Sequence, residues 1–478
     1  MNSITLETQN LLNKVSKIMS RKKKYSRITQ NNTVIRKSRN FRKSLKSKSP
    51  NQNYITKLID KYYNNDEVSK KYLQQAPRIY HKLPTQRRII VIGDIHGDFE
   101  VAIKCLILAG CIRYIEPPIN KTVSVMDAFF NTLEWIGGDT HIVQLGDQID
   151  RIRPQRWDAN DISRDTAYED EGSTLEIFYL FHHLNELSQK YGGRVLSIIG
   201  NHEIMNVDGD FRYVSQEEFR CFQDHLKHIY HNKSKFPYHS KTLKRGRLTL
   251  YNTKHHHRQL QLPIGYRERL YAFSPTGLCS NLMAMNYYTM LQIGNWLFCH
   301  GSPTIATTSK YSIDLINNIT SLYLLGLDSE DGQLEKNFDN IMHPHGDTND
   351  DEPSILWART FGENIKSPIQ EKHLSIMLNR ILRLYNNKNG NTNSETKATH
   401  IAIGHTPQFQ KGINSICDER VWRCDVGMSK AFYSSSRNNE DNSLTKLPVL
   451  EFGFERGDIQ VLEILNGKPK ILFYSDNN

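Results

Sequence analysis

The sequence predicts an α/β fold, and three features of the chain indicate it. Short apolar runs rich in β-branched residues recur after residue 87, each followed by glycine and polar residues, as buried strands are. Amphipathic stretches between these runs, such as 99–109 and 173–190, are typical of helices. The polar residues come where the runs end, and open sheets usually bind ligands at the carboxyl ends of their strands. We therefore expect a layered α/β domain with its chemistry at those strand ends.

Five of the apolar runs end in residues that suit metal coordination. They are IIVIGDIHGD (89–98), HIVQLGDQIDR (141–151), VLSIIGNHE (195–203), WLFCHG (296–301) and HIAIGHT (400–406). Two hard divalent cations need several carboxylate and imidazole ligands and one shared anionic oxygen. A single such residue is more often a turn residue or a structural histidine. Five strand ends together predict a dinuclear site, with Asp147 able to bridge and the candidate ligands Asp94, His96, Asp147, Asn201, His300 and His405.

The net charge of +11 comes from the N-terminal segment. Of the 62 lysines and arginines, 14 lie in residues 1–50, where Glu7 is the single acid. Blocks of like charge with few apolar residues predict disorder, so residues 1–84 are expected to form a basic, largely disordered extension with a short helical lead-in at 51–84. The tail could bind nucleic acid or another anionic surface, or simply be solvated, and the composition leaves these alternatives open.

The remaining chain, 85–475, is predicted to be the catalytic domain. An inserted cap or accessory region is expected at about 207–293, with a helix at 215–231. The acidic segment 329–353 is expected to be a loop, and the low-complexity segment 386–399 to be mobile.

The sequence also bears on the cellular setting. No apolar run is long enough to span a membrane, and the polar N-terminus lacks the apolar core of a secretory signal. The seven cysteines are scattered, odd in number and form no CxxC pair, which favours a reducing, intracellular location, cytoplasmic or nuclear. They also lack a CxxxxxR nucleophile motif.

The motifs occur in the order found in a known family. GDIHGD (93–98), GDQIDR (146–151), GNHE (200–203), the HG of 300–301 and GHT (404–406) resemble the phosphoprotein phosphatase family of metallophosphoesterases. GNHEIMNVDGDFRYVS (200–215), LWAR (356–359), IGHTPQF (403–409) and DVGMS (425–429) are similar to its Shewanella-like branch. The resemblance covers roughly residues 87–475. It implies a calcineurin-like metallophosphoesterase fold, a layered α-β-β-α sandwich with a dinuclear metal site.

The resemblance also implies a role for each site residue. Asp94 and His96 would bind the first metal ion, Asp147 both ions, and Asn201, His300 and His405 the second. The two divalent ions would be manganese, with iron or zinc as alternatives. His202 resembles the general acid that protonates the leaving oxygen, and Asp150 its orienting partner. Arg151 and Arg359 would bind the substrate phosphate.

Together these features predict a metal-dependent phosphatase that hydrolyses phosphate monoesters by direct attack of a metal-bridging hydroxide. Its substrate would be a phosphoprotein, with phosphate on serine, threonine or tyrosine, or a small phosphoester. The alternative is a nucleotide phosphoanhydride hydrolase of the same superfamily, acting on a dinucleoside tetraphosphate or an RNA cap. A third alternative is a binding or scaffolding protein with a vestigial site, against which the complete ligand set argues.

Overall fold

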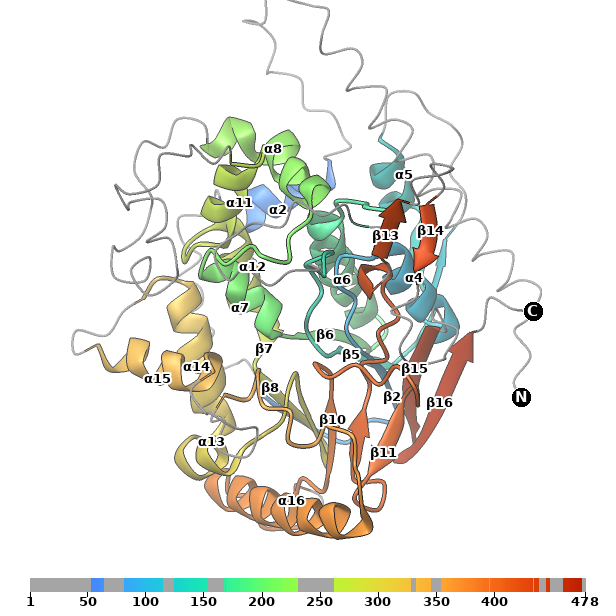
Figure 1. The fold of residues 1–478 in the computed structure, drawn as a ribbon, viewed down its shortest axis with the longest axis vertical. Coiled ribbons are helices and arrows are strands. Elements are labelled where there is room, and N and C mark those ends of the chain that lie inside the picture. Colours follow the sequence, from blue (N-terminus) through green and yellow to red (C-terminus); the bar gives the residue numbers. More distant parts are fainter. Residues whose placement is uncertain are drawn as a thin grey trace, which may run out of the picture.

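The computed structural model describes most of the chain after residue 52. The described residues are 53–63, 81–114, 124–153, 167, 169–230, 262–327, 332–344, 354–394, 396–432, 434–437, 444–447 and 459–474. The basic segment 1–50 and His255, His256 and His257 lie outside them. Helices accompany two six-stranded sheets in this part of the chain (Figure 1). The mixed α/β class is thus confirmed.

The first six-stranded sheet contains the first three predicted strands. Its order is β16-β15-β2-β5-β6-β7, which corresponds to Lys468–Tyr474, Ile459–Leu465, Arg88–Ile92, His141–Gln144, Arg194–Ile198 and Tyr287–Tyr288. Strands β2, β5, β6 and β7 are parallel, whereas β15 pairs antiparallel with β2 and with β16. The carboxyl ends of β2, β5 and β6 therefore lie at one edge of this sheet.

The second six-stranded sheet contains the other two predicted strands. Its order is β1-β8-β9-β10-β12-β11, which corresponds to Lys82–Leu83, Met290–Ile293, Trp296–Cys299, His400–Ile403, Val421–Arg423 and Asn414–Ile416. Strand β10 is parallel to both β9 and β12, and β8 and β11 pair antiparallel with β9 and β12. The segments that follow β9 and β10 are thus neighbours.

Alternation along the strands divides the apolar residues between two clusters. Val91, Val143 and Leu196 of the first sheet belong to one cluster with Phe298 and Ala402 of the second, because alternate side chains of a strand share a face. The intervening residues belong to a larger cluster that includes the helices. In Figure 1, α4 and α6 lie above the strands and α16 below them.

The three helices expected from amphipathic stretches are present. They are α4 (Phe99–Leu108), α6 (Thr174–Gln189) and α8 (Gln216–Tyr230). The other described α-helices are α2 (Tyr54–Tyr62), α5 (Val125–Asn131), α7 (Asn201–Val207), α11 (Tyr266–Phe273), α12 (Leu278–Asn286), α13 (Ile305–Lys310), α14 (Ile313–Leu324), α15 (Gln333–Met342) and α16 (Pro368–Lys388). A 3-10 helix, η2, spans Lys430–Phe432, and two small sheets pair β3 (Ile112–Tyr114) with β4 (Leu133–Trp135) and β13 (Ser434–Arg437) with β14 (Leu444–Leu447). None of the described helices has the length and apolarity of a membrane span.

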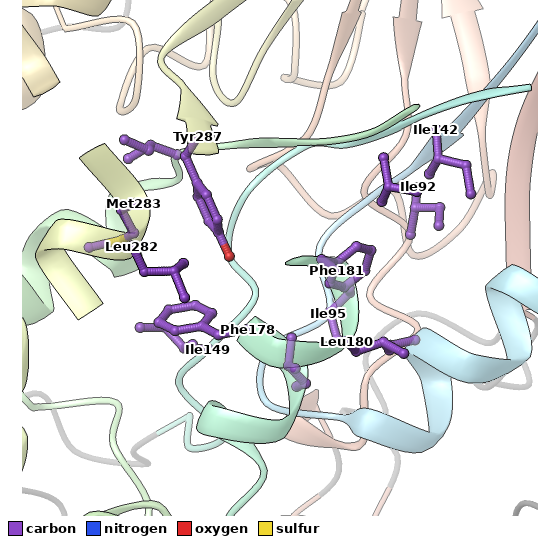
Figure 2. Close-up of a cluster of buried hydrophobic side chains, with 14 of the residues drawn as sticks. Ile92, Ile95, Ile142, Ile149, Phe178, Leu180, Phe181, Leu282, Met283 and Tyr287 are labelled. Carbon is purple, nitrogen blue, oxygen red and sulfur yellow. The ribbon is translucent and has the colours of Figure 1, made fainter. Parts of the chain in front are cut away.

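Apolar side chains hold two of the motif loops in place. Ile95, between Asp94 and His96, and Ile149, between Asp147 and Asp150, are fully buried in the larger cluster. Figure 2 shows Ile95 near Phe181 and Leu180 of α6, and Ile149 near Phe178 of α6 and Leu282 of α12. The apolar residue of each loop thus anchors it to the core, while its polar neighbours are free to serve the site.

Part of the predicted N-terminal extension belongs to the folded core. The helical lead-in at 51–84 is present as α2, and its residues Tyr54, Ile55, Leu58, Ile59 and Tyr62 are buried in the larger cluster. Further along the lead-in, β1 pairs with β8. Residues 53–63 therefore contribute to the core and residues 82–83 to a sheet, which the high charge of residues 1–50 had obscured.

Three other segments differ from the sequence-based expectations. The end of the region predicted as an insertion, 207–293, supplies α12 and the sheet strands β7 and β8. The predicted loop at 329–353 contains α15. The segment 386–399, predicted to be mobile, is tied down by Asn386, whose side chain exchanges two hydrogen bonds of 2.9 and 3.0 Å with the backbone of Ala398. The prediction of a loop at 329–353 was wrong, because composition does not reveal the long-range partners that stabilise a helix there.

Replacing Leu58 with alanine should test whether α2 is integral to the domain. Leu58 is 1% exposed in the large cluster, so the truncation should lower the free energy of unfolding by about 2–5 kcal/mol. Thr56→Ala, on the exposed face of the same helix, is the matched control and should change it by less than about 0.5 kcal/mol. Denaturant unfolding of both variants measures the difference. Equal stabilities would mean that α2 is a dispensable appendage.

Candidate metal centre

The two sheets bring all six candidate ligands to one place. Asp94 and His96 follow β2, Asp147 follows β5, and Asn201 begins α7 after β6, so the first sheet supplies four of them. His300 and His405 follow β9 and β10 of the second sheet. All six side chains are buried, with at most 5% exposure. The candidate centre therefore lies where the carboxyl ends of strands from both sheets meet.

Asp147 lies at the middle of the group. Its Oδ2 is 3.9 Å from Nε2 of His96 and 3.8 Å from Nε2 of His202, and its Oδ1 is 3.3 Å from Nε2 of His300. Two sets of ligand-type atoms, each lying within 4.8 Å of one another, share this carboxylate: His96, Asp147 and His202 in one, and Asp147, His300 and His405 in the other. These buried groups could hold metal ions.

The hydrogen bonds of His300 test whether the residues fit a cation. Its Nδ1 lies 2.8 Å from the carbonyl oxygen of Leu145, so Nδ1 carries the hydrogen and donates it. In the neutral ring Nε2 is then a bare acceptor, yet it faces Oδ1 of Asn201 at 2.8 Å and Oδ1 of Asp147. Three acceptors facing one another require a proton or a cation between them. His96 is held likewise, with Nδ1 3.3 Å from the carbonyl oxygen of Ile149, as ligating histidines typically are.

Three buried polar atoms at the centre have no hydrogen-bond partner among the described residues. They are Oδ1 of Asp94, Nε2 of His405 and Oδ2 of Asp425. A buried acceptor left without a partner is costly, so this arrangement also fits a bound cation. Burial raises the pKa of Asp94, as do the neighbouring carboxylates of Asp425 and Asp147. Burial likewise raises the pKa of Asp425 to about 6. Closely spaced carboxylates of this kind favour positive charge.

Backbone conformations that non-glycine residues rarely adopt gather at the centre. His96, Asp147, Asp150 and His405 have φ of 47°, 50°, 74° and 67°. Such left-handed conformations cost free energy and persist where the surrounding structure holds them. Their occurrence at four predicted site residues indicates that the loops are shaped for the direction of their side chains.

Two buried glutamates hold these loops. The Glu203 carboxylate accepts hydrogen bonds of 2.7–2.9 Å from the backbone N–H groups of Gly200, Asp147 and Gln148, which joins the loops after β5 and β6. Glu218 of α8 does the same for the end of GDQIDR, accepting bonds of 3.0 Å from the N–H groups of Asp150 and Arg151. A carboxylate that accepts several backbone bonds rigidifies the segments it joins.

Glycine is required beside two of the carboxylates. A Cβ on Gly200 would collide with the side chain and backbone of Asp147, and a Cβ on Gly404 with Oδ1 of Asp94. The glycine that follows each strand therefore lets the loops approach closely.

His202 is held by a chain of hydrogen bonds that ends in α11. Its Nδ1 lies 2.8 Å from Oδ2 of Asp150, so Nδ1–H donates to the carboxylate and Nε2 is directed to Asp147. The other oxygen of Asp150 accepts from Nδ2 of Asn206 at 2.9 Å and from Nη2 of Arg269 at 3.3 Å. Burial raises the pKa of Asp150, and its bonds to His202 and Arg269 oppose that rise. Arg269 itself is fully buried.

The two predicted phosphate-binding arginines lie in different surroundings. Arg359 is partly buried and donates from Nη1 to the carbonyl oxygen of His405 at 3.0 Å and to Oγ1 of Thr406 at 3.2 Å, next to the centre. Arg151 is fully buried. Its guanidinium forms an ion pair with Asp98, with 2.8 Å between Nη1 and Oδ2 and both side chains fully buried.

Three residues at the centre were not among the predicted site residues. Asp425 follows β12, the same signal that identified Asp94 and Asp147, and the sequence could have revealed it. Arg153 and Arg269 carry no comparable signal, because the first lies beyond the motif and the second lies 67 residues after His202. Only the packing of α11 brings Arg269 to Asp150.

Comparisons with known proteins agree with the motifs. The chain is 26% identical over 395 residues to Shewanella-like protein phosphatase 2 of Arabidopsis thaliana, a match covering 79% of this chain and 82% of the relative. It is 26% identical over 374 residues to Shewanella-like protein phosphatase 1 of Plasmodium berghei (strain Anka), covering 78% and 72%. A solved structure, the cold-active protein-tyrosine phosphatase of a psychrophile Shewanella species, aligns over 82% of both chains with 17% identity and a TM-score of 0.43. No protein-family model matches the chain. The chain is thus a phosphoric ester hydrolase whose sequence resembles the Shewanella-like branch of the phosphoprotein phosphatase family.

Proposed function

We propose that this protein is a metal-dependent protein phosphatase that removes phosphate from serine, threonine or tyrosine side chains. The observation that carries the proposal is the set of facing acceptors at the centre, where Nε2 of His300 meets oxygens of Asn201 and Asp147. The two relatives named above are protein phosphatases, which supports a phosphorylated protein over other phosphate esters. The calcineurin-like layering of helix, sheet, sheet and helix is part of the same proposal, supported by the apolar cluster that the two sheets share.

Two divalent ions, most suitably manganese, are proposed for the six candidate ligands gathered around Asp147. Asp94, His96 and Asp147 would hold the first ion, and Asp147, Asn201, His300 and His405 the second. Mixed oxygen and nitrogen donors suit manganese, with iron or zinc as alternatives. When bound, such ions supply Lewis acidity toward phosphate oxygens and a water of lowered pKa.

His202 is proposed as the proton donor to the leaving oxygen. The bond from Nδ1–H to Asp150 fixes the ring so that Nε2 is directed inward, as a proton donor to the leaving oxygen requires. Arg269 and Asn206 hold Asp150 from its other side. A proton held on Nε2 would neutralise the alkoxide or phenolate as it departs.

A cysteine nucleophile receives no support from the structure. All seven cysteines are buried. Burial raises the pKa of the thiols at Cys105, Cys279, Cys299 and Cys424, and raises that of Cys111 to about 12. A thiol that stays protonated near neutral pH is a poor nucleophile, which is consistent with direct attack by water.

A substrate panel tests the proposal. The purified chain, supplied with manganese, should release phosphate from phosphoserine, phosphothreonine or phosphotyrosine peptides much faster than it cleaves diadenosine tetraphosphate. A chelator should abolish turnover, and iodoacetamide treatment of the native protein should leave it intact because the thiols are buried. Cleavage of the dinucleotide far faster than every peptide would instead establish the phosphoanhydride hydrolase. Absence of turnover on all substrates would support a vestigial site.

A further inference from the structure

Arg153, two residues beyond the predicted phosphate-binding arginine, lies between two aromatic rings. Its guanidinium carbon is 5.4 Å from the ring centre of Tyr213 and 4.8 Å from that of Phe432. The two rings in turn contact histidines of the centre: Tyr213 lies 4.6 Å from the ring of His202 and Phe432 lies 5.4 Å from the ring of His96. The guanidinium is therefore fixed beside the two histidines of one ligand set.

The backbone explains why Arg153 has this position. Ile152 is 2% exposed and its N–H donates to the carbonyl oxygen of Tyr213 at 2.9 Å. This bond joins the loop after β5 to the segment that carries Tyr213. On either side of Ile152, Arg151 pairs with Asp98 and Arg153 lies against Tyr213 and Phe432.

The hydrogen bonds of Arg153 leave part of its guanidinium available. Nη1 donates to the carbonyl oxygens of Asp150 at 3.2 Å and Ile152 at 2.9 Å. Within the described part of the chain, its Nε and Nη2 donate to no acceptor and no carboxylate forms an ion pair with it. The charge of Arg153 nevertheless lies close to the site, because its guanidinium contacts the two rings that lie against His96 and His202. Burial lowers the pKa of Arg153, and the charges of Asp147 and Asp150 oppose that change.

Arg151 differs from Arg153 in having a carboxylate partner. Its guanidinium is neutralised by Asp98, and its charge also interacts with Glu171 and Asp170. Asp98 is itself fixed, because Oδ1 accepts from the N–H of Val101 at the start of α4 and Oδ2 from the N–H of Lys430. A buried pair built in this way is a structural lock. A phosphate that drew Arg151 away from Asp98 would remove the ion pair of a buried carboxylate, which is costly.

We infer that Arg153, and not Arg151, binds the substrate phosphate, with Arg359 acting from the opposite ligand set. This inference rests on the proposed function, and it assigns the ligand as a phosphate monoester dianion. The free Nε and Nη2 form a planar fork that matches two phosphate oxygens, a geometry that the lysine ammonium does not offer. The rings of Tyr213 and Phe432 hold the plane of the fork and shield its charge from water.

Binding of inorganic phosphate to the manganese-loaded full chain tests this assignment by titration calorimetry. Arg153→Lys and Arg153→Met should each raise the Kd for phosphate at least about tenfold, and lower kcat/KM for a phosphopeptide about a hundredfold. Arg151→Lys should lower the Tm yet leave the Kd for phosphate within about twofold, because it disturbs the lock and not the phosphate contact. Arg113→Lys, in an exposed ion pair with Glu134, is the matched control.

The outcomes separate the two proposals. Unchanged phosphate binding in both Arg153 variants would overturn the inference, as would loss of binding in folded Arg151→Lys. If the wild-type chain binds phosphate through Arg153 but hydrolyses no phosphopeptide, the assignment of Arg153 stands and the proposed function fails.

Discussion

Replacing Asp147 with asparagine should abolish turnover, with a fall in kcat/KM on the order of a thousandfold or more. The carboxylate belongs to both ligand sets, since its two oxygens lie 3.3–3.9 Å from Nε2 of His96, His202 and His300. An amide keeps the shape but removes the negative charge that two cations would share. Elemental analysis of the purified variant should therefore show reduced metal content as well as lost activity.

Asp139→Asn provides the matched control for this substitution. Asp139 is half exposed and pairs with Arg87 at the surface, so its neutralisation should leave metal content and turnover at wild-type values. Circular dichroism should show that both variants are folded. Wild-type activity and metal content in Asp147→Asn would refute the candidate centre itself, since no other described carboxylate belongs to both ligand sets.

The second large effect is expected for His202→Ala, which should lower kcat about a hundredfold while both metal ions are retained. The effect should depend on the leaving group. The serine oxygen of a phosphoserine peptide leaves as a basic alkoxide and needs a proton. The leaving group of p-nitrophenyl phosphate is a stable phenolate, so kcat for this substrate should fall about tenfold or less. Asp150→Asn should also lower kcat more for the phosphoserine peptide than for p-nitrophenyl phosphate, but by smaller factors. It removes the charge opposite Nδ1 of His202 but keeps the imidazole ring.

His228→Ala, at an exposed position of α8, is the control and should leave kcat unchanged for both substrates. Two results would reassign His202. Loss of metal on substitution would make it a ligand, which its membership of one ligand set would then explain. Equal losses on both substrates would exclude proton donation to the leaving oxygen.

The local patterns of the chain predicted the parts of the fold that depend on neighbouring residues. Each of the five motif strands is present, from β2 to β10, and so are the helices α4, α6 and α8. A short apolar run that is rich in β-branched residues and followed by glycine is typical of a buried strand. About ten residues are enough to recognise this pattern. For the same reason the candidate ligands were identifiable from the residues that follow each run.

Long-range packing decided the rest. Residues that no local pattern connects meet only in the folded chain: Arg269 reaches Asp150 from α11, and Asn386 closes on Ala398. The core position of α2 depends on partners far along the chain, such as Asn281, which donates from Nδ2 to the carbonyl oxygen of Tyr62 at 2.8 Å. The composition of the segments that carry these residues predicts none of these contacts.

The amino-acid sequence by itself determined that this protein has strand-end loops bearing carboxylates and imidazoles, because ligand type and strand periodicity are properties of the residues in order. Only the tertiary structure decided that these loops come from two sheets, and that Arg153 faces the centre while Arg151 is bound to Asp98. The physical reason is that the direction of a side chain in the loop after a strand depends on the residues from other parts of the chain that pack against it. Whether a buried arginine is neutralised, or keeps part of its guanidinium available, depends on the carboxylates that packing brings near it. These carboxylates lie far away in the chain.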